Sequence, residues 1–341
     1  MADFSKSLHE LIGWRFSQGG GKLVGVILWN GRVSVANLPE SRPISEQEMG
    51  LLMPPLVLDL TRLVPGPLAA QMLHCMGLRV LRVTAPTEDL LLQFAPDVYD
   101  LLQAGKETRM LDLKTTEGRE LLLEMVQESA VLIESNLPGT MERLGLGPEV
   151  LRTVKPTLVY VRMAGYRDPS SNQCPGHDLT YLAAAGLIPK LHSAWENIQI
   201  ADLCGAFWTA MAALDGLRRG GGFYEVYLAE AAQALALPAV PFLDGSVCCY
   251  GIYRASAGHV ALAALESHLW TRFCIAAGRE EWTGVALLPA NTENPVYVEI
   301  CKVFSSRTAV EWEQWAIERR IPLRAVRGEP KAMAGPPWRM G

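Results

Sequence analysis

From Leu56 onward the sequence alternates between short apolar runs rich in β-branched residues and longer amphipathic runs. The apolar runs are LVLDL at 56–60, LRVLRV at 78–83, AVLIES at 130–135 and TLVYVRMAG at 157–165. The helical patterns GPLAAQMLHCMG, TEGRELLLEMVQES, GTMERLGL and EVLRTV lie between them. Strands that alternate with helices of this length form parallel sheets with right-handed crossovers. The sequence therefore predicts an α/β, Rossmann-like large domain.

The first of these strands is not followed by a GxGxxG motif. That motif lets the backbone approach a dinucleotide closely, so its absence argues against a nicotinamide or flavin enzyme. The GGGK at 19–22 also lacks the spacing of a phosphate-binding loop and precedes a strand, which favours a turn.

The remaining sequence divides into further segments. Residues 1–52 form an N-terminal extension, with an amphipathic helix at about 5–16 and two β-rich runs joined by Asn30-Gly31, a strong hairpin signal. We place the large α/β domain at 53–222, a linker helix region at 223–245, a smaller α+β domain at 246–330 and an irregular tail at 331–341. With 49% hydrophobic residues, 341 residues are enough to bury two cores.

Charge and cysteine content exclude several classes of protein. The net charge of −5 offers no basic surface of the kind that nucleic acid requires. No run of 18 apolar residues lacks a charge or a turn-forming residue, so we expect no membrane span and a cytoplasmic location. The seven cysteines show no CxxC spacing, which favours reduced thiols over disulfides or a metal site.

One stretch, PGHDLTYLAAAGL at 175–187, places a histidine and an aspartate directly after a Pro-Gly turn. On local pattern alone, Asp178 would cap the following helix and His177 would be an exposed histidine. Asp202 would likewise cap a helix, and Glu266 would be a solvated helix residue. A catalytic interpretation therefore needs further support.

That support comes from five segments that occur in order. LDLTRLVPGPLAAQMLHCMGLRVLRV, AGKETRMLDLKTTEGRELL, ESNLPGTMERLGLG, PTLVYVRMAGY and PGHDLTYLAAAGL together resemble the class III CoA-transferase and α-methylacyl-CoA racemase superfamily. The resemblance spans about residues 56 to 325. It implies an interlocked homodimer, in which the large domain of one chain and the small domain of the other form the site.

The resemblance also implies roles for individual residues. His177 and Asp202 match the acid–base pair of the racemase branch, and Glu266 matches a glutamate that supports the histidine. Asp178 matches the covalent nucleophile of the transferase branch. Arg62 and Lys106 match cationic contacts to coenzyme A, for which their charge is suited. The chemistry requires no metal or redox cofactor, only coenzyme A or a pantetheine thioester as the substrate carrier.

Inversion at a carbon acid needs one group to remove a proton from one face and another to return one to the opposite face. A histidine and a partly buried carboxylate can share that task near neutral pH. We therefore interpret the chain as an epimerase of α-methylacyl thioesters.

The chain also departs from the family pattern. Leu137 replaces an arginine where FRPG reads NLPG, Thr84 replaces a glutamate, and the loop from Ile188 to Ile200 is short. These departures leave open an acyl carrier protein as the partner in place of CoA. They also leave two alternatives: a CoA-transferase with Asp178 as nucleophile, and a degenerate, non-catalytic family member.

Overall fold

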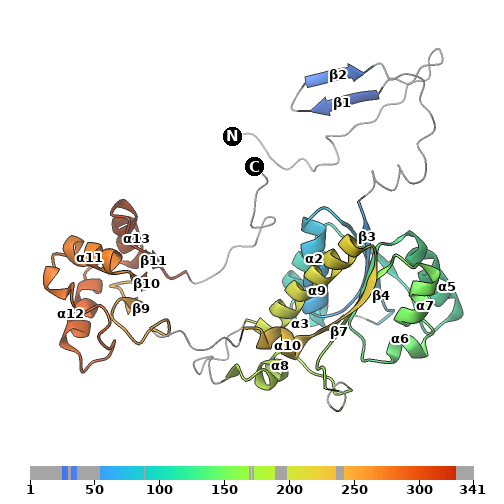
Figure 1. The fold of residues 1–341 in the computed structure, drawn as a ribbon. Coiled ribbons are helices and arrows are strands. Elements are labelled where there is room, and N and C mark those ends of the chain that lie inside the picture. The colour runs from blue at the N-terminus through green and yellow to red at the C-terminus, as the bar shows by residue number, and fades with distance from the viewer. Residues whose placement is uncertain are drawn as a thin grey trace. The chain divides into compact units, whose positions relative to one another are not determined.

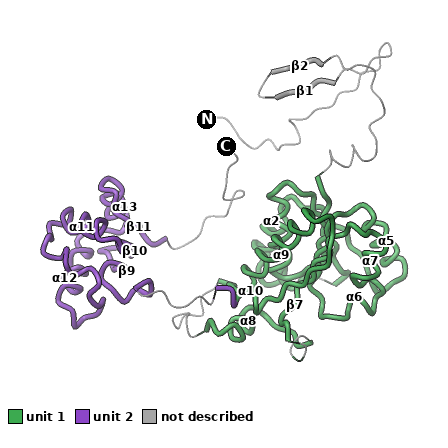
Figure 2. Tube along the Cα trace, viewed as in Figure 1, with its two compact units in different colours: residues 1–232 green, residues 233–341 purple. Residues whose placement is uncertain are grey.

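A computed structural model describes residues 54–87, 89–168, 170, 173–188, 198–235 and 242–327, together with the backbone of 25–29 and 32–36. The chain divides into two compact units, residues 1–232 and 233–341 (Figure 2).

The first unit is built on a six-stranded parallel sheet. Its strands lie in the order β5-β4-β3-β6-β7-β8, which is the doubly wound order with its switch point between β3 and β6. The strands are β3 (Leu56–Leu60), β4 (Arg79–Thr84), β5 (Glu107–Met110), β6 (Val131–Glu134), β7 (Val159–Ala164) and β8 (Gly222–Tyr227). The predicted Rossmann-like α/β fold is confirmed.

Helices cover both faces of this sheet (Figure 1). One face carries α2 (Pro65–Cys75) and α9 (Ile200–Arg219), and the other carries α5 (Thr116–Glu128), α6 (Thr140–Arg143) and α7 (Pro148–Val154). Every residue of β6 and β7 is buried between the two layers, which explains their continuous apolar sequence. The other α-helices that the structure describes in this part of the chain are α3 (Leu90–Phe94), α4 (Pro96–Gln103), α8 (Asp178–Ala184) and α10 (Leu228–Gln233), whose last residue belongs to the second unit.

Strand β8 lies where the sequence analysis placed a linker. The large domain was predicted to end at residue 222, but β8 pairs in parallel with β7 as the sixth strand of the sheet. The glycines before it form a tight connection, with positive φ at Gly220, Gly221 and Gly222. A run of glycines can therefore mark a sharp helix-to-strand turn inside a domain as well as a boundary.

Helix α9 is long and apolar enough to cross a membrane, judged by length and composition only. Here it contacts α2 and strands β7 and β8, and 44% of its most apolar window is buried. A core helix of a water-soluble unit gives the same signal.

The second unit is a small α+β structure, as predicted. An antiparallel sheet in the order β11-β10-β9 packs with three α-helices around an aromatic core. Its elements are β9 (Tyr250–Arg254), β10 (His259–Ala263), α11 (Ser267–Ala276), the 3-10 helix η3 (Glu280–Trp282), α12 (Pro295–Phe304), α13 (Ala309–Glu318) and β11 (Leu323–Ala325). The buried Trp270 donates its indole N–H to the carbonyl of Trp282 at 2.8 Å, which satisfies its one polar atom.

Near the N-terminus, β1 (Gly25–Trp29) and β2 (Arg32–Ala36) pair antiparallel, with Trp29 opposite Arg32. This is the segment in which the sequence predicts a hairpin. The helix predicted at 5–16 and the tail at 331–341 lie outside the described residues.

We expect Gly221→Ala to lower the free energy of unfolding by about 1–3 kcal/mol, the range for a non-glycine residue held in a strained backbone region. Gly221 has φ +124°, and an added Cβ would lie 2.9 Å from the carbonyl carbon of Thr157. The matched control is Gly284→Ala, because a Cβ at Gly284 meets nothing within 4 Å. Chemical denaturation of both variants measures the difference, and equal stability would contradict the assignment of strain.

Candidate active site

Two cavities open at the carboxyl ends of the parallel strands. The larger, of about 730 Å³, is lined by residues at or after the ends of β3, β4 and β6, including Thr61, Thr84 and Asn136. The smaller, of about 320 Å³, lies over the ends of β6 and β7. Ligands of doubly wound folds bind at this edge, beside the switch point in strand order. We refer to the two cavities as the large cavity and the small cavity.

The small cavity brings together the two residues predicted as an acid–base pair. His177 lies immediately before α8 and Asp202 lies in the first turn of α9, and both line this cavity. Thr180 fixes the backbone of His177: its hydroxyl accepts the His177 N–H at 3.1 Å and donates to the His177 carbonyl at 2.8 Å. The starts of α8 and α9 thus bring these two residues, which are distant in sequence, to the same cavity.

Asp178 has a different environment. Its Oδ1 accepts the backbone N–H of Asp202 at 3.0 Å, so its carboxylate lies at the N-terminus of α9. A carboxylate at this position satisfies a backbone donor and interacts favourably with the helix dipole. Asp178 is not among the residues that line either cavity. Its described contacts are those of a helix cap that holds Asp202, and its predicted part in the chemistry stays a prediction.

The electrostatics of Asp202 suit proton transfer. Burial, reinforced by the nearby negative charge of Asp178, raises the pKa of Asp202 to about 7. A carboxyl group with this pKa can donate or accept a proton near neutral pH, which an ordinary aspartate does poorly. The small cavity therefore offers an imidazole, from His177, and a carboxyl group whose pKa is raised to about 7, from Asp202.

The two predicted cations differ in position. Arg62 is exposed in the turn after β3 and lines both cavities. The side chain of Lys106 is completely buried: its Nζ lies 3.4 Å from Asp59 Oδ2 and donates to the Pro67 carbonyl at 2.7 Å. Burial lowers the pKa of Lys106, although the neighbouring Asp59 opposes this shift.

Lys106 is not among the residues that line either cavity, so its predicted contact with coenzyme A stays a prediction. Its observed contacts stabilise the turn that carries Arg62. Asp59 Oδ1 accepts hydrogen bonds from the backbone N–H and the hydroxyl of Thr61. Lys106 thus supports Arg62 through Asp59 and Thr61.

Glu266 lies in the second unit, directly before α11, where it is exposed. Its predicted support of His177 stays a prediction. Among the described residues, no group of three His, Cys, Asp or Glu side chains could hold a metal ion.

Arg82 and Asn136 are among the lining residues that were not identified from the sequence. Arg82 in β4 is 1% exposed, lines the large cavity, and places Nη2 2.5 Å from Asp89 Oδ2. A charged residue within a buried strand is a signal that could have revealed it. Asn136 lines both cavities, and a single amide in a loop carries no such signal.

The chain resembles a family of known proteins in sequence and in structure. The family profile of CoA-transferase family III matches residues 55–341. The α-methylacyl-CoA racemase of Homo sapiens is 30% identical over 287 residues, which cover 76% of this chain and 73% of that protein. The succinyl-CoA:mesaconate CoA-transferase of Haloarcula hispanica is 28% identical over 272 residues, covering 68% and 69%. The crystal structure of the hypothetical protein Rv3272 from Mycobacterium tuberculosis is 27% identical, with a TM-score of 0.69 and coverage of 81% and 83%.

We expect Asp178→Asn to lower the pKa of Asp202, because the variant keeps an acceptor oxygen for α9 but removes the negative charge that helps to raise that pKa. A ¹³C NMR titration of the aspartate carboxyl groups measures the change without any need for activity. Asp215→Asn is the matched control, since Asp215 pairs with Arg218 and Arg219 at the other end of α9. An unchanged Asp202 titration in Asp178→Asn would contradict the coupling.

Proposed function

We propose that this chain, which belongs to CoA-transferase family III, inverts the configuration at the α-carbon of α-methylacyl thioesters. The observation that carries this proposal is the shared lining of the small cavity by His177 and Asp202. The pKa of Asp202, raised by burial to about 7, supports the same assignment. The similarity to the human racemase is consistent with it.

His177 and Asp202 together account for every proton that moves in this reaction. Neutral His177 removes the α-proton and becomes an imidazolium, while the electrons of the broken C–H bond move into the thioester carbonyl to form an enolate. The protonated carboxyl of Asp202 then delivers its proton to the opposite face of the α-carbon, and the carbonyl re-forms. The reverse reaction uses ionised Asp202 as base and the His177 imidazolium as acid. Exchange of both protons with solvent resets the enzyme.

The carrier end of the substrate occupies the large cavity in this proposal. Arg62 lines both cavities and is suited to an anionic group on coenzyme A or on a phosphopantetheine arm. The thioester lies in the small cavity, so that its α-carbon lies between His177 and Asp202. Leu137 also lines the small cavity and gives an apolar contact for an acyl chain.

We expect inversion to fall by roughly 10²- to 10⁴-fold when either base is removed, the usual contribution of a positioned acid or base. Each enantiomer of a 2-methylacyl thioester is incubated in deuterated water, and both deuterium uptake and chirality are followed. His177→Ala should lower inversion to this extent yet leave some exchange in the enantiomer whose proton faces Asp202, and Asp202→Ala should show the reverse pattern.

The controls for this experiment are His259→Ala and Asp215→Asn. His259 is exposed on β10 and Asp215 lies at the far end of α9. Circular dichroism checks that every variant is folded. Undiminished inversion in either active-site variant would remove that residue from the mechanism.

CoA transfer is a second candidate, because the relatives include a CoA-transferase at 28% identity. In that reaction Asp178 would attack the thioester carbonyl, form a mixed anhydride and release the thiolate of coenzyme A. The bond from the α9 backbone to Asp178 counts against an attacking role for that oxygen. Hydroxylamine added after incubation with acyl-CoA would convert an anhydride to a hydroxamate, and a hydroxamate on Asp178 would favour the transferase.

We also propose that the chain acts in the cytoplasm as a homodimer, in which the second unit of one chain supplies Glu266 to His177 of the other. Light scattering should then give twice the chain mass of 37.4 kDa. Mixing His177→Ala with Glu266→Ala chains should restore part of the activity, because half of the sites in a mixed dimer keep both residues. A monodisperse monomer with full activity would contradict the proposal.

A further inference from the structure

The two cavities meet at a short loop between β6 and α6, residues 135–139. Asn136 in this loop lines both cavities. Arg62, in the turn after β3, also lines both of them. A ligand that extends from the large cavity to the small one therefore passes Asn136.

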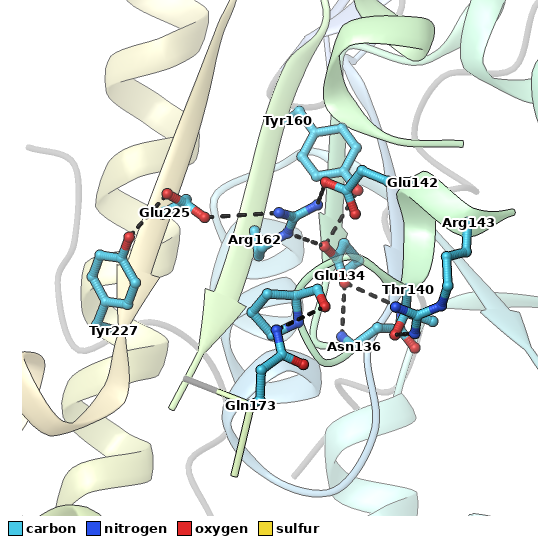
Figure 3. Close-up of polar contacts among 11 residues, drawn as sticks. Glu134, Asn136, Thr140, Glu142, Arg143, Tyr160, Arg162, Gln173, Glu225 and Tyr227 are labelled. Atoms are coloured by element: carbon cyan, nitrogen blue, oxygen red, sulfur yellow. Dashed lines mark hydrogen bonds and ion pairs between the residues drawn. The ribbon is translucent and has the colours of Figure 1, made fainter. Parts of the chain in front are cut away.

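The side chain of Asn136 is held in one orientation (Figure 3). Glu134 Oε2 accepts the backbone N–H of Asn136 at 2.7 Å and its Nδ2 at 3.1 Å. A carboxylate accepts hydrogen bonds, so the amide nitrogen of Asn136 must face Glu134 and the amide oxygen must face away. Within the described part of the chain no hydrogen bond to that oxygen is formed. Asn136 thus presents an unused acceptor where the cavities meet.

Glu134 is itself fixed by a buried ion pair. Its Oε1 accepts Nε of Arg162 at 2.7 Å, and Glu134 is completely buried. Arg162 also donates to Glu142 at 2.6 Å (Figure 3). Burial raises the pKa of Glu134, whereas the bonds from Arg162 and Asn136 oppose that rise. Both carboxylate oxygens are thereby occupied by donors, and neither can rotate without breaking a buried contact.

A second contact ties the loop to the segment that carries His177. Gln173 Nε2 donates to the Pro138 carbonyl at 3.3 Å (Figure 3). Pro138 and the stretch from Cys174 to His177 all line the small cavity. The loop that orients Asn136 and the segment that presents His177 are therefore adjoining walls of one site.

We propose that Asn136 is a specificity residue for the arm that carries the thioester, and that Glu134 and Arg162 position it. Its amide oxygen accepts a hydrogen bond from an amide N–H on that arm. A pantetheine arm carries such N–H groups, whereas a plain alkyl thioester carries none. The inference rests on the proposed function for the direction of the arm, from the large cavity towards His177 and Asp202.

The test measures binding of two unreactive thioethers, so that it needs no turnover. One is S-butyl-pantetheine, and the other has the same chain length with esters in place of amides and hence no N–H donor. Asn136→Leu removes the acceptor at similar side-chain volume. We expect its Kd for S-butyl-pantetheine to rise roughly 3- to 10-fold, the usual loss for one neutral hydrogen bond, with an unchanged Kd for the ester analogue.

A matched control is Gln314→Leu, which makes the same kind of change at an exposed amide on α13. Two further variants separate positioning from stability. Glu134→Gln can turn an N–H donor towards Asn136, which should reduce the preference for the amide probe. Glu142→Gln removes the charge from another partner of Arg162 but leaves Glu134 in place, and should retain that preference.

The outcomes separate the two proposals. Equal loss of affinity for both probes in Asn136→Leu would mean a purely structural role, and no loss for either would mean no contact; each result would overturn the inference. A selective loss with no α-proton exchange in the wild type would support the role of Asn136 and contradict the proposed function. A selective loss together with exchange would support both.

Discussion

The parallel pairing of β3 with both β4 and β6 is the constraint on which the site depends. The chain leaves β3 towards one side of the sheet and returns on the other side of β3 to form β6, so the loops after these two strands diverge. The cavities open where they diverge. Arg62 follows β3 and Asn136 follows β6, which is why these residues, 74 positions apart, line the same two cavities.

The strands in the middle of the sheet could be predicted because burial on both faces leaves a continuous apolar run. LVLDL at 56–60 corresponds residue for residue to β3. The edge strand β5 could not be found in this way, since all four of its residues are exposed and its sequence, ETRM, has no apolar period. Strand β8 begins at Gly222, where the predicted large domain ends, so the sequence analysis placed it outside the sheet.

The site was predictable to the extent that local sequence determines it. The start of α8 at Asp178 follows from the Pro-Gly turn, and the resemblance predicts His177 and Asp202 as the acid–base pair. The contacts that determine the surroundings of the predicted site residues join residues far apart in the sequence. Asp178 accepts a hydrogen bond from Asp202, and Lys106 donates one to Asp59. Whether Lys106 faces a ligand or a buried carboxylate depends on packing, and no spacing in the sequence encodes it.

The buried charges of the first unit share one location. Asp59, Arg82 and Glu134 lie in β3, β4 and β6, all near the carboxyl ends of the strands. Each has a partner of opposite charge within 3.4 Å, namely Lys106, Asp89 and Arg162. Removing charges from water costs about as much as such pairs return, so they are weak evidence for stability.

Their positions indicate a different role. The pair at Asp59 fixes the turn that carries Arg62, and the pair at Glu134 orients Asn136. An apolar core would pack these strand ends as well, but it would leave the turns above them free to adopt several conformations. Directional hydrogen bonds select one conformation. Asp59 and Glu134 thus make their directional contacts at the edge of the sheet from which both cavities open.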